Sequence, residues 1–200
     1  MGGLGFPLRG DTFLNRWRED KLDAPFIHMK TMPMNEDLEP ATPSTQLRDE
    51  TYVDILAYIL RVNTYPAGRA ELTMDALDSI ELTGKNGPKP LPTNSTVKVA
   101  GCLTERPGGE WGLTNSSAPI RTRNLMETNA EELKASEAAP LTDQVFRLNN
   151  LDRVSNFRSD AQNRQKLQVK GVLIWDRDND RSKDRINVTS LHVVSSSCTR

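Results

Sequence analysis

The sequence predicts an α+β protein of two domains, a small all-α domain followed by a β-rich domain. Apolar residues recur at helical spacing up to residue 62. A stretch dense in proline and glycine follows at residues 84–94. Beyond it lie short runs rich in β-branched residues. We therefore expect a helical domain over residues 1–78, a linker over 79–95 and a β domain over 96–200.

Two short helices are expected first. Phe13 and Trp17 are four residues apart, so one helical face could bury both. A second helix is expected to begin near Asp23, whose side chain can cap it. It should end before Pro33, because proline disfavours helical geometry in the residue before it.

The third helix, over residues 49–62, has the clearest amphipathic pattern of the chain. Acidic residues at its start suit the positive end of the helix dipole. Pro66 and Gly68 follow its expected end. The apolar stripe consists of Val53, Leu56, Ile59 and Leu60.

The C-terminal half predicts five strands that close, wholly or partly, into an OB-like β-barrel. Gly101 and Gly171 stand where such a barrel would have to bend. One helix is expected between strands, within residues 126–139. The expected strands cover residues 96–103, 110–114, 145–148, 166–175 and 185–194. In the last strand, alternation places Ile186, Val188, Ser190, His192 and Val194 on one face.

Composition excludes several classes of function. The chain is 36% hydrophobic and 26% charged, and it has no apolar run near the ~20 residues that a membrane-spanning helix needs. The two halves, divided after residue 95, carry formal charges of −4 and +3, which is not the field of a dedicated nucleic-acid binder. The first residues show no pattern of an export signal.

Three segments of the first half resemble class I c-type cytochromes. They are Gly5 to Trp17, the step Thr31-Met32-Pro33, and the helix around Leu56 to Leu60 with its following turn. In the family, the first segment follows the haem-attachment site, the second carries an axial ligand of the iron, and the third closes over the haem edge. The resemblance covers about residues 5–72 and is closest to small cytochrome domains found with quinoprotein dehydrogenases.

The resemblance implies electron transfer through haem c, without bond-making catalysis. Met32 would be the distal ligand of the iron, since a thioether suits low-spin haem iron. The apolar wall of the haem site would consist of Phe13, Trp17, Leu56 and Ile59. A redox partner such as a periplasmic dehydrogenase or oxidase is expected, and so is an exported or periplasmic full-length protein.

The motif that fixes haem c is missing from these residues. No Cys-x-x-Cys-His occurs in the sequence, so the thioether attachment and the proximal histidine have no source in it. We expect the chain to be a truncated form of a longer cytochrome, with the motif upstream of Gly5. The alternative is a haem-free module for protein interaction.

Neither histidine replaces the missing one. His28 precedes Met32 by four residues, which places both on one face of a helix, whereas axial ligands approach the iron from opposite faces. We therefore expect His28 to be a surface or half-buried residue without a ligand role. His192 falls in a strand of the β domain, where a packed imidazole is expected.

The β domain offers a second alternative, an OB-type site for a ligand or nucleic acid. Single-strand binding needs several exposed aromatic rings along a basic groove. This half has four aromatic residues, Trp111, Phe146, Phe157 and Trp175. Phe146 and Trp175 alternate into apolar runs and are expected in the core, so nucleic-acid binding is disfavoured.

Two further motifs have structural interpretations. Cys102 and Cys198 would lie close together in an OB-like barrel. In an exported protein we expect a disulfide between them, which would stabilise the fold by about 4 kcal/mol. In the cytosol we expect two buried thiols instead. Residues 176–184 begin like a calcium loop. Arg181 stands where that loop needs glycine, and Asn187 replaces its bidentate glutamate, so a plain turn is expected.

Overall fold

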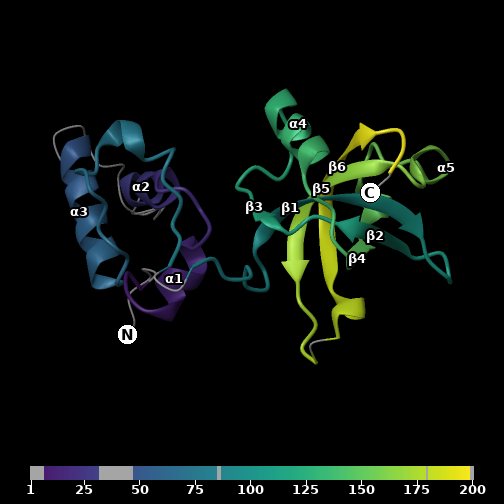
Figure 1. Cartoon of the computed structure of the whole chain (residues 1–200), viewed down its shortest axis with the longest axis horizontal. Helices are drawn as coiled ribbons and strands as arrows, with labels where there is room; N and C mark the ends of the chain where they lie inside the picture. Colours follow the sequence, from purple (N-terminus) through teal and green to yellow (C-terminus); the bar gives the residue numbers. More distant parts are fainter. Residues whose placement is uncertain (1–6, 32–46, 85–86, 179, 199–200) are drawn as a thin grey trace, which may run out of the picture. The chain divides into compact units, whose positions relative to one another are not determined.

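The computed structural model describes residues 7–31, 47–84, 87–178 and 180–198, and Figure 1 shows its fold. The chain divides into two compact units, unit 1 (Met1–Pro90) and unit 2 (Leu91–Arg200). The boundary falls within the stretch rich in proline and glycine. None of the helices in these ranges has the length and apolarity that crossing a membrane requires.

Unit 1 is built from short helices around one apolar cluster. An isolated β-bridge between Lys21 and Glu81 joins the segment before α2 to the end of the unit. The helices are α1 (Asp11–Trp17), α2 (Asp23–Lys30), α3 (Asp49–Val62) and the 3-10 turn η1 (Met74–Ala76). The bounds predicted for the third helix are confirmed by α3.

The amphipathic pattern of α3 determines how it packs. Val53, Leu56 and Ile59 are buried, and Leu60 on the flank of the stripe is half-buried. Asp49 and Glu50 lie in the first turn, where negative charge suits the helix dipole. The helix stops where Thr64 adopts a left-handed backbone, with φ of 64°.

Unit 2 contains one six-stranded mixed sheet in the order β2-β4-β6-β5-β1-β3, in which β2 also pairs with β1. The strand β4 runs parallel to β6, and every other pair is antiparallel. The strands are β1 (Thr96–Glu105), β2 (Trp111–Ser116), β3 (Ile120–Arg121), β4 (Gln144–Asn149), β5 (Lys166–Ile174) and β6 (Arg185–Ser195). The helical elements are α4 (Ala130–Ala138), η2 (Leu151–Arg153), α5 (Ser159–Gln162) and η3 (Arg181–Lys183).

The prediction of an all-α domain followed by a five-stranded OB-like barrel is wrong. The structure is mixed α+β, with six strands in one mixed sheet whose pairings run in a ring through β1, β2, β4, β6 and β5. The additional strand, β3, has only two residues and pairs with Val97 and Lys98 of β1. A strand of that length shows no alternation in the sequence, because alternation needs several residues.

The prediction that one face of β6 runs unbroken from Ile186 to Val194 is also wrong. The pairing of β5 with β6 shifts register between Lys170 and Gly171, where Ser190 and Val188 are the successive partners. This bulge adds one residue to β6, and a shift of one residue exchanges the faces of a strand. Ile186 and Val188 therefore point into the core before the bulge, and Leu191 does so after it.

The core of unit 2 lies inside the ring of strands. It is made of side chains from every strand except the short β3, together with Leu91 and residues around η2. Gly171 lies at the bulge, where an added Cβ would collide with the backbone carbonyl of Asn187. Glycine therefore permits the close approach of β5 to β6 at this point.

Candidate functional site

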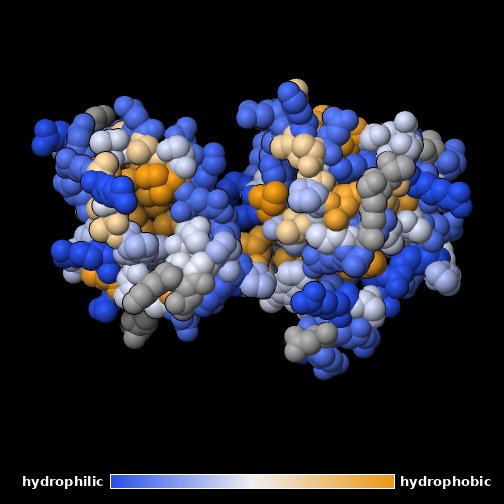
Figure 2. Space-filling view, in the orientation of Figure 1, coloured by the Kyte–Doolittle hydropathy of each residue, from blue (hydrophilic) through white to orange (hydrophobic). Residues whose placement is uncertain are grey.

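The four residues that the resemblance assigns to the haem wall come together in unit 1. Phe13 and Trp17 are supplied by α1. Leu56 and Ile59 are supplied by α3, and none of the four side chains is more than 5% exposed. We call the buried group to which they belong the helical cluster; its other members are Leu22, Phe26, Val53, Leu77 and Leu82. Figure 2 shows apolar side chains gathered in the middle of the visible face of this unit, with hydrophilic ones around them.

Asn63, at the end of α3, ties the two wall-bearing helices to each other. Its Nδ2 donates to the carbonyl oxygens of Leu8 and Ile59, both at 2.8 Å. Its Oδ1 accepts a hydrogen bond from the backbone N–H of Gly10 at 2.9 Å. The side chain is buried, so these bonds hold the entry of α1 against the end of α3 where water is excluded.

His28 lies in α2 and is half-buried against the helical cluster. Its ring packs at a tilt against Trp17, with 5.3 Å between ring centroids. The expected half-buried histidine is thus confirmed, and its closest ring neighbour is a member of the predicted wall. Met32 lies outside the described residues.

The helical cluster gathers large apolar side chains that exclude water, which is the property that the resemblance requires of a haem wall. The ligand set is less complete. Across residues 7–31, 47–84, 87–178 and 180–198, no group of three or more His, Cys, Asp or Glu side chains could hold a metal ion.

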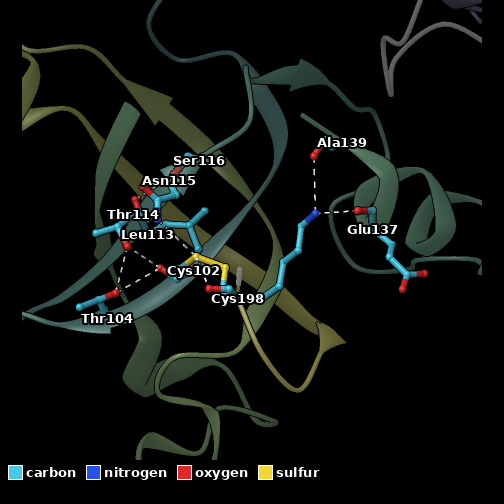
Figure 3. The surroundings of a disulfide bond; sticks show 10 residues. Cys102, Thr104, Leu113, Thr114, Asn115, Ser116, Glu137, Ala139 and Cys198 are labelled. Atoms are coloured by element: carbon cyan, nitrogen blue, oxygen red, sulfur yellow. Dashed lines mark hydrogen bonds between the residues drawn. A yellow bond between two sulfur atoms is a disulfide. The ribbon is translucent and has the colours of Figure 1, made fainter. Parts of the chain in front are cut away.

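Unit 2 contains a disulfide between Cys102 and Cys198, with their Cα atoms 5.5 Å apart (Figure 3). It fixes the segment after β6 to the middle of β1. Beside it, the hydroxyl groups of Thr104 and Thr114 lie 3.0 Å apart and both donate toward the carbonyl oxygen of Cys102. Of the two readings left open by the sequence, the structure has the disulfide.

A polar layer separates α4 from the outer face of the sheet. Lys170 of β5 is fully buried, and its Nζ donates to Glu132 Oε2 at 2.8 Å and to the carbonyl oxygen of Glu127 at 2.5 Å. Lys98 of β1 contacts the other oxygen of Glu132 at 3.1 Å. At the opposite end of α4, Lys166 donates to the carbonyl oxygen of Glu137 at 2.6 Å, where a cation suits the helix dipole (Figure 3).

The charges of this layer shift the pKa values of two groups. Burial opposes ionisation of Glu132, but hydrogen bonds from Lys170 and Lys98 outweigh it and lower the pKa of the carboxyl group. Burial lowers the pKa of His192, the positive charge of Lys170 lowers it further, and Glu132 opposes both. His192 lies opposite Gln168, whose fully buried amide has no hydrogen-bond partner within the described part of the chain. The layer is therefore held by charge, with little apolar contact.

The four aromatic residues of unit 2 separate into two pairs. Phe146 is fully buried in the core, and Trp175 packs against it with 6.0 Å between ring centroids, as expected. Trp111 and Phe157 meet edge to face, with centroids 5.4 Å apart, and both line a pocket.

The loop that begins like a calcium site is a turn. The carboxylate of Asp176 accepts a hydrogen bond from the backbone N–H of Asp178, and that of Asp180 accepts one from the backbone N–H of Ser182.

Comparison with known proteins found no match for this chain among family models, curated proteins or solved structures.

Proposed function

We propose that unit 1 belongs to a class I c-type cytochrome domain that transfers single electrons through haem c. The observation that carries the proposal is the helical cluster. The residues that the resemblance assigns to a haem wall come from two separated segments of the sequence, and they are buried together. This burial is what a haem wall requires, and it also follows from the apolar stripes of α1 and α3, so the spectroscopic test decides between the two.

Each residue has a defined part in this proposal. Met32 would provide the distal thioether ligand, which raises the reduction potential relative to a second imidazole. Phe13 and Trp17 from α1, with Leu56 and Ile59 from α3, would keep water away from the iron. Haem c, when bound, supplies the one-electron chemistry. The protein would therefore be an electron carrier without an enzyme activity of its own.

The proposal requires a Cys-x-x-Cys-His motif from polypeptide preceding these residues, because the sequence has none. The test is to read the genomic frame upstream of the Met1 codon and to express the extended protein with a haem-maturation system. We expect covalently bound haem with the absorption signature of methionine ligation. An in-frame stop codon without such a motif upstream would contradict the proposal.

The disulfide supports an exported, periplasmic location. Disulfides persist in oxidising compartments and are rare in the cytosol, and Cys102–Cys198 closes a separation of 96 residues. Maturation of c-type haem also belongs to such a compartment, so both features favour the same location. The redox partner would be a periplasmic dehydrogenase or oxidase.

A haem-free interaction module is the second candidate function. One observation favours it: Leu56 is fully buried and the other wall residues are nearly so, which means that the cluster packs well without a cofactor. The expression test separates the two functions. An extended protein that is folded but colourless after maturation would support the haem-free module.

A further inference from the structure

A pocket in unit 2 combines aromatic, cationic and acidic side chains. Its volume is about 390 Å³, which is within the range of small-molecule sites. It lies where the loop after β1, the end of β4, the start of β6 and the turn η2 meet. We call it the arginine pocket, after Arg147 and Arg185, which line one side.

Arg147 and Arg185 form a pair of like charges that has one loose acidic partner in the described part of the chain, Glu110. Arg147 of β4 and Arg185 of β6 are register partners on neighbouring parallel strands. Like charges opposite each other in a sheet are destabilising, so this arrangement calls for a compensating anion. Glu110 is the acidic neighbour of Arg147, but the two groups are 3.9 Å apart and the Glu110 side chain is 58% exposed.

Arg147 donates through its Nε to the carbonyl oxygen of Ser182 at 3.3 Å, whereas the second guanidinium of the pair is not engaged by any residue that the structure describes. The guanidinium of Arg185 makes no hydrogen bond or ion pair in the ranges that the structure describes. Arg106 lies across Gly112, the register partner of Arg147, with its Cδ 3.0 Å from where a Cβ of Gly112 would be. Its Nη1 is buried without a partner in the same ranges. Arg106, from the loop after β1, therefore lies over β2 next to Arg147, although it is not one of the residues that line the pocket.

The other sides of the pocket suit a ring and its hydroxyl groups. Trp111 and Phe157 are half-buried and hold each other edge to face, which fixes two aromatic groups at the pocket. Stacking on such side chains is favourable for any flat ring. Asp152 of η2 lines the pocket with an exposed carboxylate, an acceptor for ligand hydroxyl groups.

We propose that the arginine pocket binds a nucleoside phosphate. The phosphate would neutralise Arg147 and Arg185, since arginine pairs with phosphate through two parallel hydrogen bonds. The base would stack on Trp111, whose ring Phe157 supports edge to face, and Asp152 would accept from the ribose hydroxyl groups. This inference is independent of the function proposed for unit 1.

The test is calorimetric titration of the full chain with AMP, adenosine and ribose 5-phosphate as separate probes. We expect AMP to bind more tightly than either part. Arg185→Gln should weaken AMP binding by at least about tenfold, the usual loss for a hydrogen bond to a charged group, and should leave adenosine binding unchanged. Trp111→Leu should weaken AMP and adenosine and spare ribose 5-phosphate.

Arg177→Gln is the matched control, because Arg177 is an exposed arginine of the same unit that does not line the pocket. It should bind AMP like the unchanged protein. Failure of AMP to saturate at millimolar concentration, or equal AMP affinity of the Arg185→Gln variant, would overturn the proposal. Tighter binding of a single-stranded oligonucleotide than of AMP would also overturn it, in favour of a nucleic-acid groove.

Discussion

Gly171 is the glycine of unit 2 at which an added Cβ would meet the nearest neighbouring atom. The backbone of Asn187 occupies the place where a side chain would begin. We predict that Gly171→Ala destabilises the protein by about 1–3 kcal/mol, the usual cost of overpacking, as measured by chemical denaturation. Gly84→Ala is the control, since nothing lies within 4 Å of its added Cβ. Equal stability of the two variants would show that β5 and β6 can separate without cost.

Glu132 is the residue on which the polar layer beneath α4 depends. Its side chain is 24% exposed, and it pairs with Lys170, which is fully buried. Glu132→Gln leaves that ammonium without its anion, so we predict a loss of about 1–3 kcal/mol at neutral pH after allowance for solvent screening. Glu131→Gln, on the exposed side of the same helical turn, should cost less than about 0.5 kcal/mol.

The stabilisation that Glu132 provides should depend on pH. The pKa of Glu132 is lowered in the folded state, so its contribution is complete above the unfolded value of about 4.3. It is lost as the pH falls through the folded pKa. The stability difference between the unchanged protein and Glu132→Gln, followed by urea denaturation, should therefore narrow below about pH 4. A constant difference down to pH 3 would contradict the ion-pair account.

At the scale of elements, α4, all of whose residues the structure describes, is a helix that buries no large apolar side chain. Ser136 is its one buried residue among the described positions, and its N-terminus is capped by Asn129, whose Oδ1 accepts from the backbone N–H of Glu132 at 2.8 Å. Asn129→Ala should cost about 1 kcal/mol of helix stability. Amide hydrogen exchange should then be about fivefold faster in α4 and unchanged in β5.

Asn129→Ser keeps an oxygen that can cap the helix, so its exchange rates should stay close to those of the unchanged protein. If Asn129→Ala and Asn129→Ser exchange alike, the cap does not limit the opening of α4.

Elements with a strong periodic pattern could be predicted from the sequence, and short or irregular ones could not. The apolar residues of α3 recur at helical spacing along its fourteen positions, and the helix begins and ends where expected. The strand β3 has two residues, too few for any period. The faces of β6 depend on a bulge beside Ser190 that only its pairing with β5 reveals. A helix was expected over residues 126–139, and α4 is shorter because Asn129 caps it.

The two candidate sites also differ in how much of each could be predicted from the sequence. The burial of the four residues assigned to the haem wall could be predicted because a local pattern places each on one helical face, whereas their role as a haem wall rests on the resemblance. The arginine pocket could not, because Arg147 and Arg185 meet only through the parallel pairing of β4 with β6. Neither residue stands out in the sequence, where exposed arginine is ordinary.

At the scale of the whole molecule, the disulfide is the principal covalent constraint in unit 2. It links residues 96 positions apart and fixes the end of the chain to β1. Replacing both Cys102 and Cys198 by serine should destabilise unit 2 by about 4 kcal/mol, mainly through the entropy of the unfolded chain. Chemical denaturation of unit 2 measures the loss. A reducing agent should lower the stability of the unchanged protein and leave the double variant unaffected; an equal response of both would contradict the prediction.

The central proposal is that unit 1 binds haem c and that Met32 is the distal ligand of its iron. A haem peptide, which carries haem c on its own Cys-x-x-Cys-His and leaves one axial position open, supplies the half that this sequence lacks. Mixing it with the full chain tests both parts of the claim by absorption spectroscopy. We predict a low-spin spectrum with the methionine band at the red end of the visible range, lost in Met32→Ala and kept in Met29→Ala. An unchanged haem-peptide spectrum, or a band that survives in Met32→Ala, would contradict the claim.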